Sequence, residues 1–195
     1  MAKNILICGV GGQGTVLAAK VISQAALAGG KKVFSAETIG MAQRGGSVTS
    51  HVRIGDDVFS PLIPQGQADL IIAFDASEAV RNIKYLKKDG TVVINTKTVQ
   101  PTTASLTGKI FDSSEMIDYL KKIGAKIIPV NADKISGEIG SSKIVNMILL
   151  GCASQSKIFS KDELLSALKI LVKPAFYELN VKAINEGEKL AFETE

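Results

Sequence analysis

Short apolar runs alternate with longer amphipathic stretches over the first 130 residues of this chain. The runs have the length and the β-branched content of buried strands, and they lie at residues 4–8, 32–36, 70–74, 91–94 and 126–130. The stretches place apolar side chains at helical spacing, and they lie at residues 15–28, 76–88 and 113–122. Strands that alternate with helices predict an α/β fold, here a three-layer, Rossmann-like arrangement with a mainly parallel sheet.

The pattern changes at two places. From Ser47 to Ile54 apolar and polar residues alternate, and Gly55-Asp56-Asp57 then leads into Val58-Phe59, which predicts an inserted β-hairpin. Asp89-Gly90 is expected to form a turn. After residue 130 the pattern is helical: a buried helix at 144–153, one from a capping box at Ser160 to about Val172, and one from Pro174 to about Gly187. We therefore expect residues 1–195 to form a single domain closed by C-terminal helices.

A glycine-rich loop follows the first predicted strand. Gly9, Gly11 and Gly14 have the spacing G-x-G-x-x-G, with Gly12 and Gln13 between them. Between a strand and a helix, this spacing is typical of dinucleotide-binding loops, because glycines allow a sharp turn and the helix N–H groups face a phosphate.

An acidic residue also stands where a ribose-binding carboxylate is found in nicotinamide enzymes. Glu37 lies after the second predicted strand, 23 residues beyond Gly14. Together with the glycine spacing, it supports one hypothesis, a stand-alone NAD(P)- or FAD-dependent oxidoreductase. The size of the chain argues against it, because 195 residues leave little room for a substrate domain.

A second glycine-rich motif runs from Glu37 to Ser47 and contains Gln43, Arg44, Gly45 and Gly46. It follows the second predicted strand, at the carboxyl edge where ligands collect in open α/β sheets. An arginine can bind a phosphate or carboxylate with two hydrogen bonds, and the glycines allow close approach of the backbone. The plainer alternative is a glycine-rich connection with a surface arginine.

Composition narrows the classes of function. The net charge of +4 comes from scattered lysine pairs, without the dense basic stripe of a nucleic-acid-binding protein. No apolar run approaches the roughly 20 residues that span a bilayer, and no signal-peptide pattern opens the chain, so we expect a cytoplasmic protein. The two cysteines, Cys8 and Cys152, are expected to be buried free thiols, and no metal site is predicted.

These motifs together resemble the gamma-type subunit or domain of 2-oxoacid:ferredoxin oxidoreductases. The resemblance rests on Gly9–Gly14, on Glu37–Gly46 and on the segment Gly140–Gly151, and it covers about residues 3–190. The version of the second motif found here is closest to the indolepyruvate ferredoxin oxidoreductase beta subunit branch of that family.

The resemblance implies a role within a larger enzyme. Complexes of this family oxidatively decarboxylate a 2-oxoacid on thiamine diphosphate, pass electrons through iron–sulfur clusters to ferredoxin and release an acyl-CoA. Two cysteines are too few for a [4Fe–4S] cluster, which needs four thiolates. Thiamine diphosphate, Mg and the 4Fe-4S clusters are therefore expected in a partner alpha subunit.

This chain is expected to complete the active site without a catalytic residue of its own. Coenzyme A is the cofactor it would help to hold, through Gly9, Gly11, Gly12, Gln13 and Gly14 of the first loop and Gln43, Arg44, Gly45 and Gly46 of the second. Alone, the chain could self-associate through apolar surface meant for its partner. A non-catalytic nucleotide-binding or assembly module is a further hypothesis.

The remaining polar candidates have structural explanations beside functional ones. His51 on an alternating strand is expected to be structural or exposed, and Asp75 after a buried strand is expected to cap the next helix. Asn131 and Asp133 are expected in a loop. Lys143 and Asn146 either face a ligand or begin the buried helix.

Overall fold

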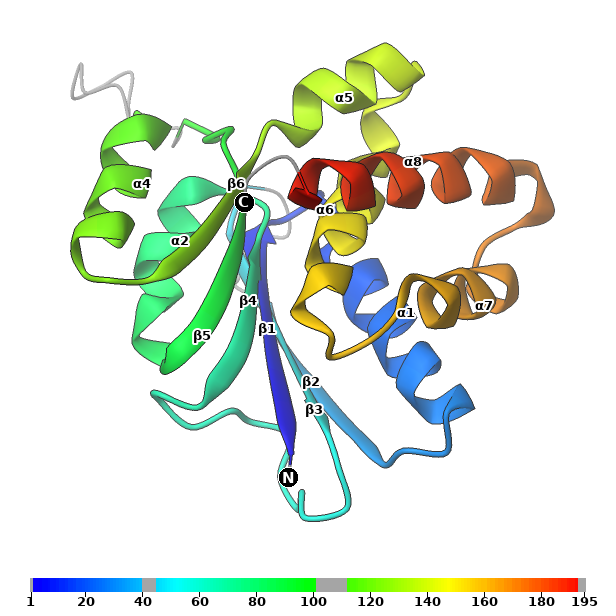
Figure 1. The fold of residues 1–195 in the computed structure, drawn as a ribbon, viewed down its shortest axis with the longest axis horizontal. Helices are drawn as coiled ribbons and strands as arrows, with labels where there is room; N and C mark the ends of the chain where they lie inside the picture. The colour runs from blue at the N-terminus through cyan, green and yellow to red at the C-terminus, as the bar shows by residue number, and fades with distance from the viewer. Residues whose placement is uncertain (1, 40–44, 101–111, 193–195) are drawn as a thin grey trace.

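The computed structural model describes residues 2–39, 45–100 and 112–192. Six strands form one sheet in the order β2-β3-β1-β4-β5-β6 (Figure 1). The strands are β1 (Lys3–Val10), β2 (Val33–Ile39), β3 (Ser47–Ile54), β4 (Ala68–Ala73), β5 (Leu86–Asn95) and β6 (Lys126–Val130). Strand β3 runs antiparallel to both of its neighbours, and β1, β4, β5 and β6 are parallel. The mainly parallel sheet predicted from the sequence is confirmed.

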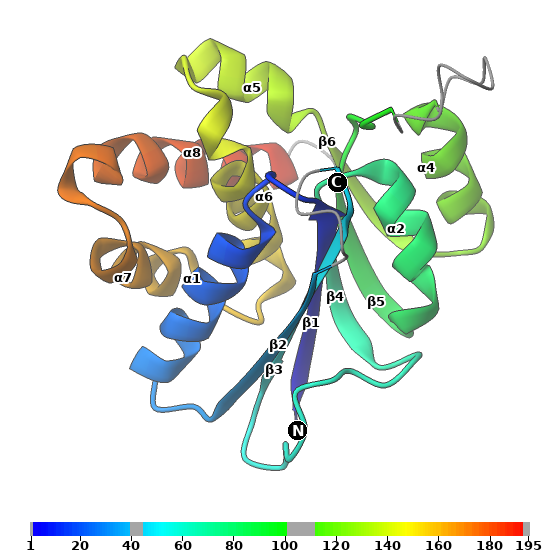
Figure 2. The same ribbon diagram turned by 180° about the vertical axis from the view of Figure 1, so that it is seen from behind.

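Helices cover both faces of the sheet (Figures 1 and 2). They are α1 (Thr15–Ala28), α2 (Ala76–Asn82), α4 (Ser113–Lys122), α5 (Ala132–Ile139), α6 (Val145–Ala153), α7 (Lys161–Leu171) and α8 (Pro174–Phe192), with short 3₁₀ turns at Ile83–Tyr85, Ser142–Ile144 and Ser154–Ser156. One face carries α1, α6, α7 and α8, and the other carries α2 and α4. The structure thus has three layers.

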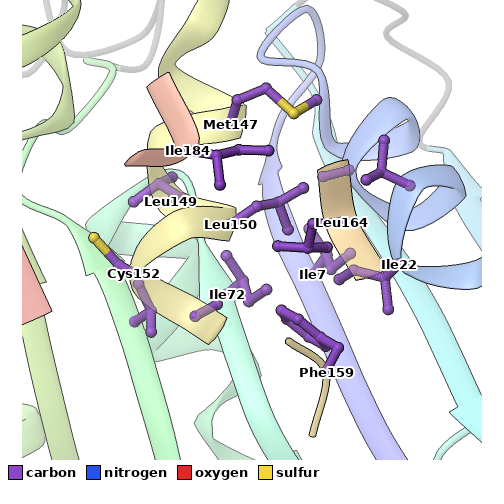
Figure 3. Packing of buried hydrophobic residues seen from close by; sticks show 14 of the residues in the cluster. Ile7, Ile22, Ile72, Met147, Leu149, Leu150, Cys152, Phe159, Leu164 and Ile184 are labelled. Atoms are coloured by element: carbon purple, nitrogen blue, oxygen red, sulfur yellow. The ribbon is translucent and has the colours of Figure 1, made fainter. Parts of the chain in front are cut away.

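The two cores follow from the alternation of side chains along each strand. Ile7 and Ile72 point to the larger core, where they meet α6 through Leu150 and α8 through Ile184 (Figure 3). Their sequence neighbours Leu6 and Ile71 point to the smaller core beneath α2 and α4.

Helices α6 and α8 cross at two glycines. A Cβ atom added to Gly151 would stand 2.1 Å from the carbonyl oxygen of Ile184, and one added to Gly187 would stand 2.0 Å from that of Ile148. The Cys152 thiol also donates to the Gly187 carbonyl oxygen at 2.9 Å. The helix predicted to end near Gly187 instead continues to Phe192, because this glycine serves close packing.

Several other predicted boundaries were wrong. Strand β3 pairs with β2, which precedes it, and Val58-Phe59 forms no strand. Asp89-Gly90 lies inside β5 and forms no turn; the ladder between β4 and β5 shifts register there, and glycine fits such an irregularity. Helix α2 therefore ends at Asn82, well short of residue 88.

The hairpin is thus formed by β2 and β3, around the second glycine motif. Strand β2 lies beyond β3, so β1 and β2 are not neighbours in the sheet. Ser47, at the start of β3, pairs with Val10 at the carboxyl end of β1.

His51 holds the segment that follows β3. Its side chain is only 5% exposed, and Nδ1 accepts a hydrogen bond from the Ile63 backbone N–H at 3.2 Å. Its ring meets that of Tyr85 edge to face, with centroids 5.6 Å apart. The structural role expected for His51 fits these contacts.

Folding stability is expected to fall as the pH drops below about 6.5, through His51. Burial lowers the pKa of His51, so the unfolded chain takes up a proton that the folded chain excludes. The loss at pH 5.5 is at most about 1.4 kcal/mol, given an unfolded pKa near 6.5. Urea unfolding of the wild type and of His51→Gln at pH 7.5 and 5.5 measures it. An equal change in both proteins would contradict the assignment.

Candidate functional site

The carboxyl ends of β1 and β4 form a topological switch point. Helix α1, which follows β1, lies on one face of the sheet, and α2, which follows β4, lies on the other (Figure 2). Open α/β sheets bind ligands in the crevice that such a divergence leaves. The glycine loop at residues 11–14 stands at this point.

Glycine is required at three positions of the loop for two different reasons. Gly12 and Gly14 have φ values of +100° and +86°, which side chains rarely adopt. Gly9 is crowded, because an added Cβ would lie 2.7 Å from Gln13 Oε1 and 2.9 Å from Phe74 Cβ. Beyond Gly14, the first N–H groups of α1 have no acceptor within the helix, so they are available to an anion.

The Gln13 side chain stabilises the glycine loop through two hydrogen bonds. Its Oε1 accepts a hydrogen bond from the Val10 N–H at 2.7 Å, and its Nε2 donates to the Phe74 carbonyl oxygen at 3.2 Å. The carboxamide therefore joins the ends of β1 and β4. This explains in physical terms why the loop carries a glutamine between its glycines.

The second glycine motif is joined to the first. The Gly11 N–H donates to the Gly46 carbonyl oxygen at 2.8 Å, and Gly45 has a φ of +78°. Ser47 then donates its hydroxyl proton to Oε2 of the buried Glu78 at 2.6 Å. Gln43 and Arg44, the other predicted members of the motif, lie outside the described residues.

A cavity of about 490 Å³ opens beside the glycine loop. Gly12 and Gly14 line one side, and Asn95, Lys97 and Asp133 line another. The start of α6 and the turn before it complete the wall through Lys143, Val145 and Asn146. Lys97 and Asp133 pair with each other, so the Lys143 ammonium and the amino-terminal end of α1 are the groups of the lining that favour an anionic ligand.

Asn146 is the most distinctive polar group of the cavity. The residue is only 4% exposed, and its Oδ1 accepts from the Met147 backbone N–H at 3.0 Å. Its Nδ2 lies 2.8 Å from the point where a Cβ of Gly14 would stand. Within the part of the chain that the structure describes, Nδ2 has no acceptor. Asn146 thus lies in the first turn of the buried helix, one of the two roles considered for it, and its contact with a ligand stays a prediction.

A polar chain extends along the sheet edge from the loop. Asn95 Nδ2 donates to the Phe74 carbonyl oxygen at 3.3 Å and to Asp133 Oδ2 at 2.8 Å, and Lys97 Nζ donates to Asp133 Oδ1 at 2.7 Å. Sequence reasoning missed this cluster. The available signal was an asparagine at the end of one strand and an aspartate just after the next, because neighbouring parallel strands end at the same edge.

The predicted loop around residue 131 is a helix. Asn131 caps α5, its Oδ1 accepting from the Lys134 N–H at 3.1 Å, and Asp133 lies in the first turn. Asp75 caps α2 as predicted, through the backbone N–H groups of Ser77 and Glu78. Its second carboxylate oxygen accepts from the Val99 N–H at 2.6 Å.

Glu37 does not stand where a ribose-binding acid is expected. It lies inside β2, two residues before the strand ends, with an exposed side chain, and it does not line the cavity. The strand is longer than its apolar run, since β2 continues to Ile39. Glu37 therefore does not support the hypothesis of a nicotinamide-dependent oxidoreductase.

The cysteines are unsuited to metal binding. Cys8 and Cys152 are free, fully buried and packed in different cores. Burial raises the pKa of Cys8, and that of Cys152 to about 12, so both stay protonated thiols. Among the described residues, no three His, Cys, Asp or Glu side chains gather as a metal site. An iron–sulfur cluster does not fit these thiols.

No helix in the described ranges is long and apolar enough to cross a membrane.

Comparison with known proteins agrees with the fold and with the motifs. A protein-family model described as pyruvate ferredoxin/flavodoxin oxidoreductase matches residues 4–190. The indolepyruvate oxidoreductase subunit IorB of Archaeoglobus fulgidus is 41% identical over 190 residues, covering 96% of this chain and 94% of its own.

Two solved structures share the fold. The gamma subunit of a keto/oxoacid ferredoxin oxidoreductase from Geobacter sulfurreducens has a TM-score of 0.72 at 24% identity, covering 98% of this chain and 99% of its own. The 2-oxoglutarate:ferredoxin oxidoreductase of Magnetococcus marinus, with 2-oxoglutarate, coenzyme A and succinyl-CoA bound, has a TM-score of 0.76 at 22% identity, covering 98% of this chain and 31% of its own. The family model spans both glycine motifs and the α6 segment on which the resemblance rests, and the chain belongs to the pyruvate ferredoxin/flavodoxin oxidoreductase family.

Proposed function

We propose that this chain is the small subunit of a cytoplasmic 2-oxoacid:ferredoxin oxidoreductase that acts on indolepyruvate or a similar aryl pyruvate. The observation that carries the proposal is the 41% identity to an indolepyruvate oxidoreductase subunit over nearly the full length of both chains. The two buried thiols add support, because a chain without cluster ligands needs a partner for electron transfer.

The partner is a larger alpha subunit that carries thiamine diphosphate, Mg and the 4Fe-4S clusters. There the 2-oxoacid loses carbon dioxide, its acyl group passes to coenzyme A, and the electrons leave for ferredoxin. The present chain contributes the cavity beside the glycine loop, which completes the site in the complex.

In this proposal the cavity holds the phosphates of coenzyme A. The α1 amino-terminal N–H groups, Asn146 Nδ2 and the Lys143 ammonium are donors on one side of the cavity. Asp133 is the acidic residue that lines the cavity. Its Oδ1 lies 2.7 Å from the Lys97 ammonium nitrogen, and this ion pair reduces the repulsion of an anionic ligand. Arg44 would add a guanidinium from the motif joined to this loop through Gly46.

Co-purification tests the proposed assembly. The tagged chain, isolated from its native cell, is expected to bring down a large subunit whose iron and thiamine diphosphate are measurable. A monomer that binds NADH tightly and retains no large subunit would contradict the proposal and support the stand-alone oxidoreductase.

Arg44→Ala is expected to raise the KM for coenzyme A about tenfold in the assembled complex, because one charge-assisted hydrogen bond to a phosphate is lost. The KM for the 2-oxoacid should stay unchanged. The measurement is ferredoxin reduction at varied coenzyme A, with Lys121→Ala on α4 as a charge-matched control. Unchanged coenzyme A kinetics in Arg44→Ala would contradict this role.

A further inference from the structure

Asp133 places a carboxylate in a cavity where Lys143 and the amino-terminal end of α1 favour an anion. It lies in the first turn of α5, and its side chain is 30% exposed and lines the cavity. A negative group in such a place weakens the binding of every anion. Lys97 reduces this repulsion, because its Nζ donates to Asp133 Oδ1 at 2.7 Å. The carboxylate nevertheless remains in the wall as a hydrogen-bond acceptor.

Asn95 fixes the direction of this carboxylate. Asn95 is only 1% exposed, and its Nδ2 donates to Asp133 Oδ2 at 2.8 Å and to the Phe74 carbonyl oxygen at 3.3 Å. Its Oδ1 accepts a hydrogen bond from the Ala132 N–H at 3.3 Å. Both polar atoms of this buried amide therefore have partners, and a satisfied buried network is held in one geometry.

The oriented carboxylate can accept further hydrogen bonds. Within the described residues, Oδ1 accepts one from Lys97 and Oδ2 accepts one from Asn95. An ionised carboxylate has about four lone-pair sites, so both oxygens can still accept from a ligand. The cavity thus combines donors, at the start of α1 and on Lys143 and Asn146, with an acceptor on Asp133.

We propose that Asp133 determines specificity by accepting a hydrogen bond from an uncharged donor of the ligand, namely a hydroxyl, amide N–H or amino group. The ligand is then an anion that also carries such a donor. A bare anion is disfavoured, because it meets the carboxylate with nothing to donate. Coenzyme A has both parts, a diphosphate and several hydroxyl, amide and amino groups, so this inference rests on the proposed function and sharpens it.

Opposite changes for two ligands test this role in the assembled complex. Asp133→Asn removes the charge and sets an amide donor against the donors of Lys97 or Asn95, so the acceptor is lost. The KM for coenzyme A is expected to rise about tenfold with kcat unchanged, because a hydrogen bond to a charged group outweighs the repulsion that is also removed. Inorganic pyrophosphate, a bare diphosphate, is expected to compete with coenzyme A with an inhibition constant about threefold lower. Ferredoxin reduction measures both constants.

Asp162→Asn is the matched control. Asp162 lies two residues after the N-cap of α7, as Asp133 does in α5, and it is exposed and does not line the cavity. Both constants should stay at their wild-type values in this variant. Asp133→Ser is a second variant, which removes the carboxylate without setting a donor against Asn95. It should raise the KM for coenzyme A and lower the inhibition constant for pyrophosphate, as Asp133→Asn does.

Three results would overturn the proposal. If both constants fell in the Asp133 variants, the carboxylate would only repel anions, and if both rose, it would only shape the wall. If neither constant changed while Asn146→Asp raised the KM for coenzyme A, Asp133 would not contact the ligand and the proposed function would stand. If the Asp133 and Asn146 variants all kept the wild-type KM, coenzyme A would bind elsewhere, and the proposed role of the cavity would fail together with the inference.

Discussion

Gly151→Ala is expected to lower the free energy of unfolding by at least about 3 kcal/mol, as an overpacked core with backbone displacement does. The new Cβ would stand 2.1 Å from the Ile184 carbonyl oxygen, far inside van der Waals contact. The atom that would have to move belongs to the α8 backbone, so no change of side-chain rotamer relieves the overlap. Helices α6 and α8 would have to separate, and both contribute to the larger core.

The same substitution at Gly137 is the matched control. Gly137 is exposed on α5, and no atom lies within 4 Å of a Cβ built there. Gly137→Ala should therefore stabilise the protein by about 0.5–1 kcal/mol, through helix propensity. Urea unfolding measures both variants. If Gly151→Ala unfolded at the wild-type midpoint, the close crossing of α6 and α8 would be wrong.

The elements that the sequence predicts well are those whose pattern is local. The helix beginning at Ser160 has a complete capping box, and the structure contains both of its hydrogen bonds. The buried helix near residues 144–153 is evident from its uninterrupted apolar residues. In both cases a few adjacent residues determine the conformation.

The elements that the sequence predicts poorly depend on distant contacts. Glycine often marks the end of a helix, so Gly187 predicts that α8 ends there. The helix continues, and the glycine is explained by its close packing against the Ile148 carbonyl oxygen. Strand β3 pairs with β2, and the Gly46 carbonyl oxygen before it accepts a hydrogen bond from the distant Gly11 N–H. Neither contact leaves a trace in the local pattern of apolar residues.

The candidate site divides in the same way. The spacing of Gly9, Gly11 and Gly14 predicts the position of the loop, because strand, turn and helix are contiguous. Asn146 on α6 and Asp133 on α5 line the same cavity. The order of the strands in the sheet brings these two helices beside the loop. Their spacing from the loop, more than 100 residues, matches no short motif.

Asn146→Asp is expected to raise the KM for coenzyme A about 100-fold in the assembled complex, the loss of one donor to a phosphate together with the repulsion of a new carboxylate. The carboxylate oxygen can still accept from the Met147 N–H, as Oδ1 does now at 3.0 Å. The buried carboxylate has a desolvation cost, and the positive amino-terminal ends of α1 and α6 beside it offset that cost, so the thermal midpoint of the unliganded protein should change little. Weak use of coenzyme A in a stable protein is therefore the distinguishing result.

Asn131→Asp is the matched control for this prediction. Asn131 caps α5 through Lys134 and does not line the cavity, and aspartate caps a helix as well as asparagine does. Ferredoxin reduction at varied coenzyme A, and separately at varied 2-oxoacid, should show a raised KM for coenzyme A in Asn146→Asp only. Equal KM values for coenzyme A in the two variants would mean that the anionic part of the ligand binds elsewhere. A loss of stability in Asn146→Asp alone would instead make Asn146 a structural residue of α6, since a ligand contact predicts a change in binding without one in folding.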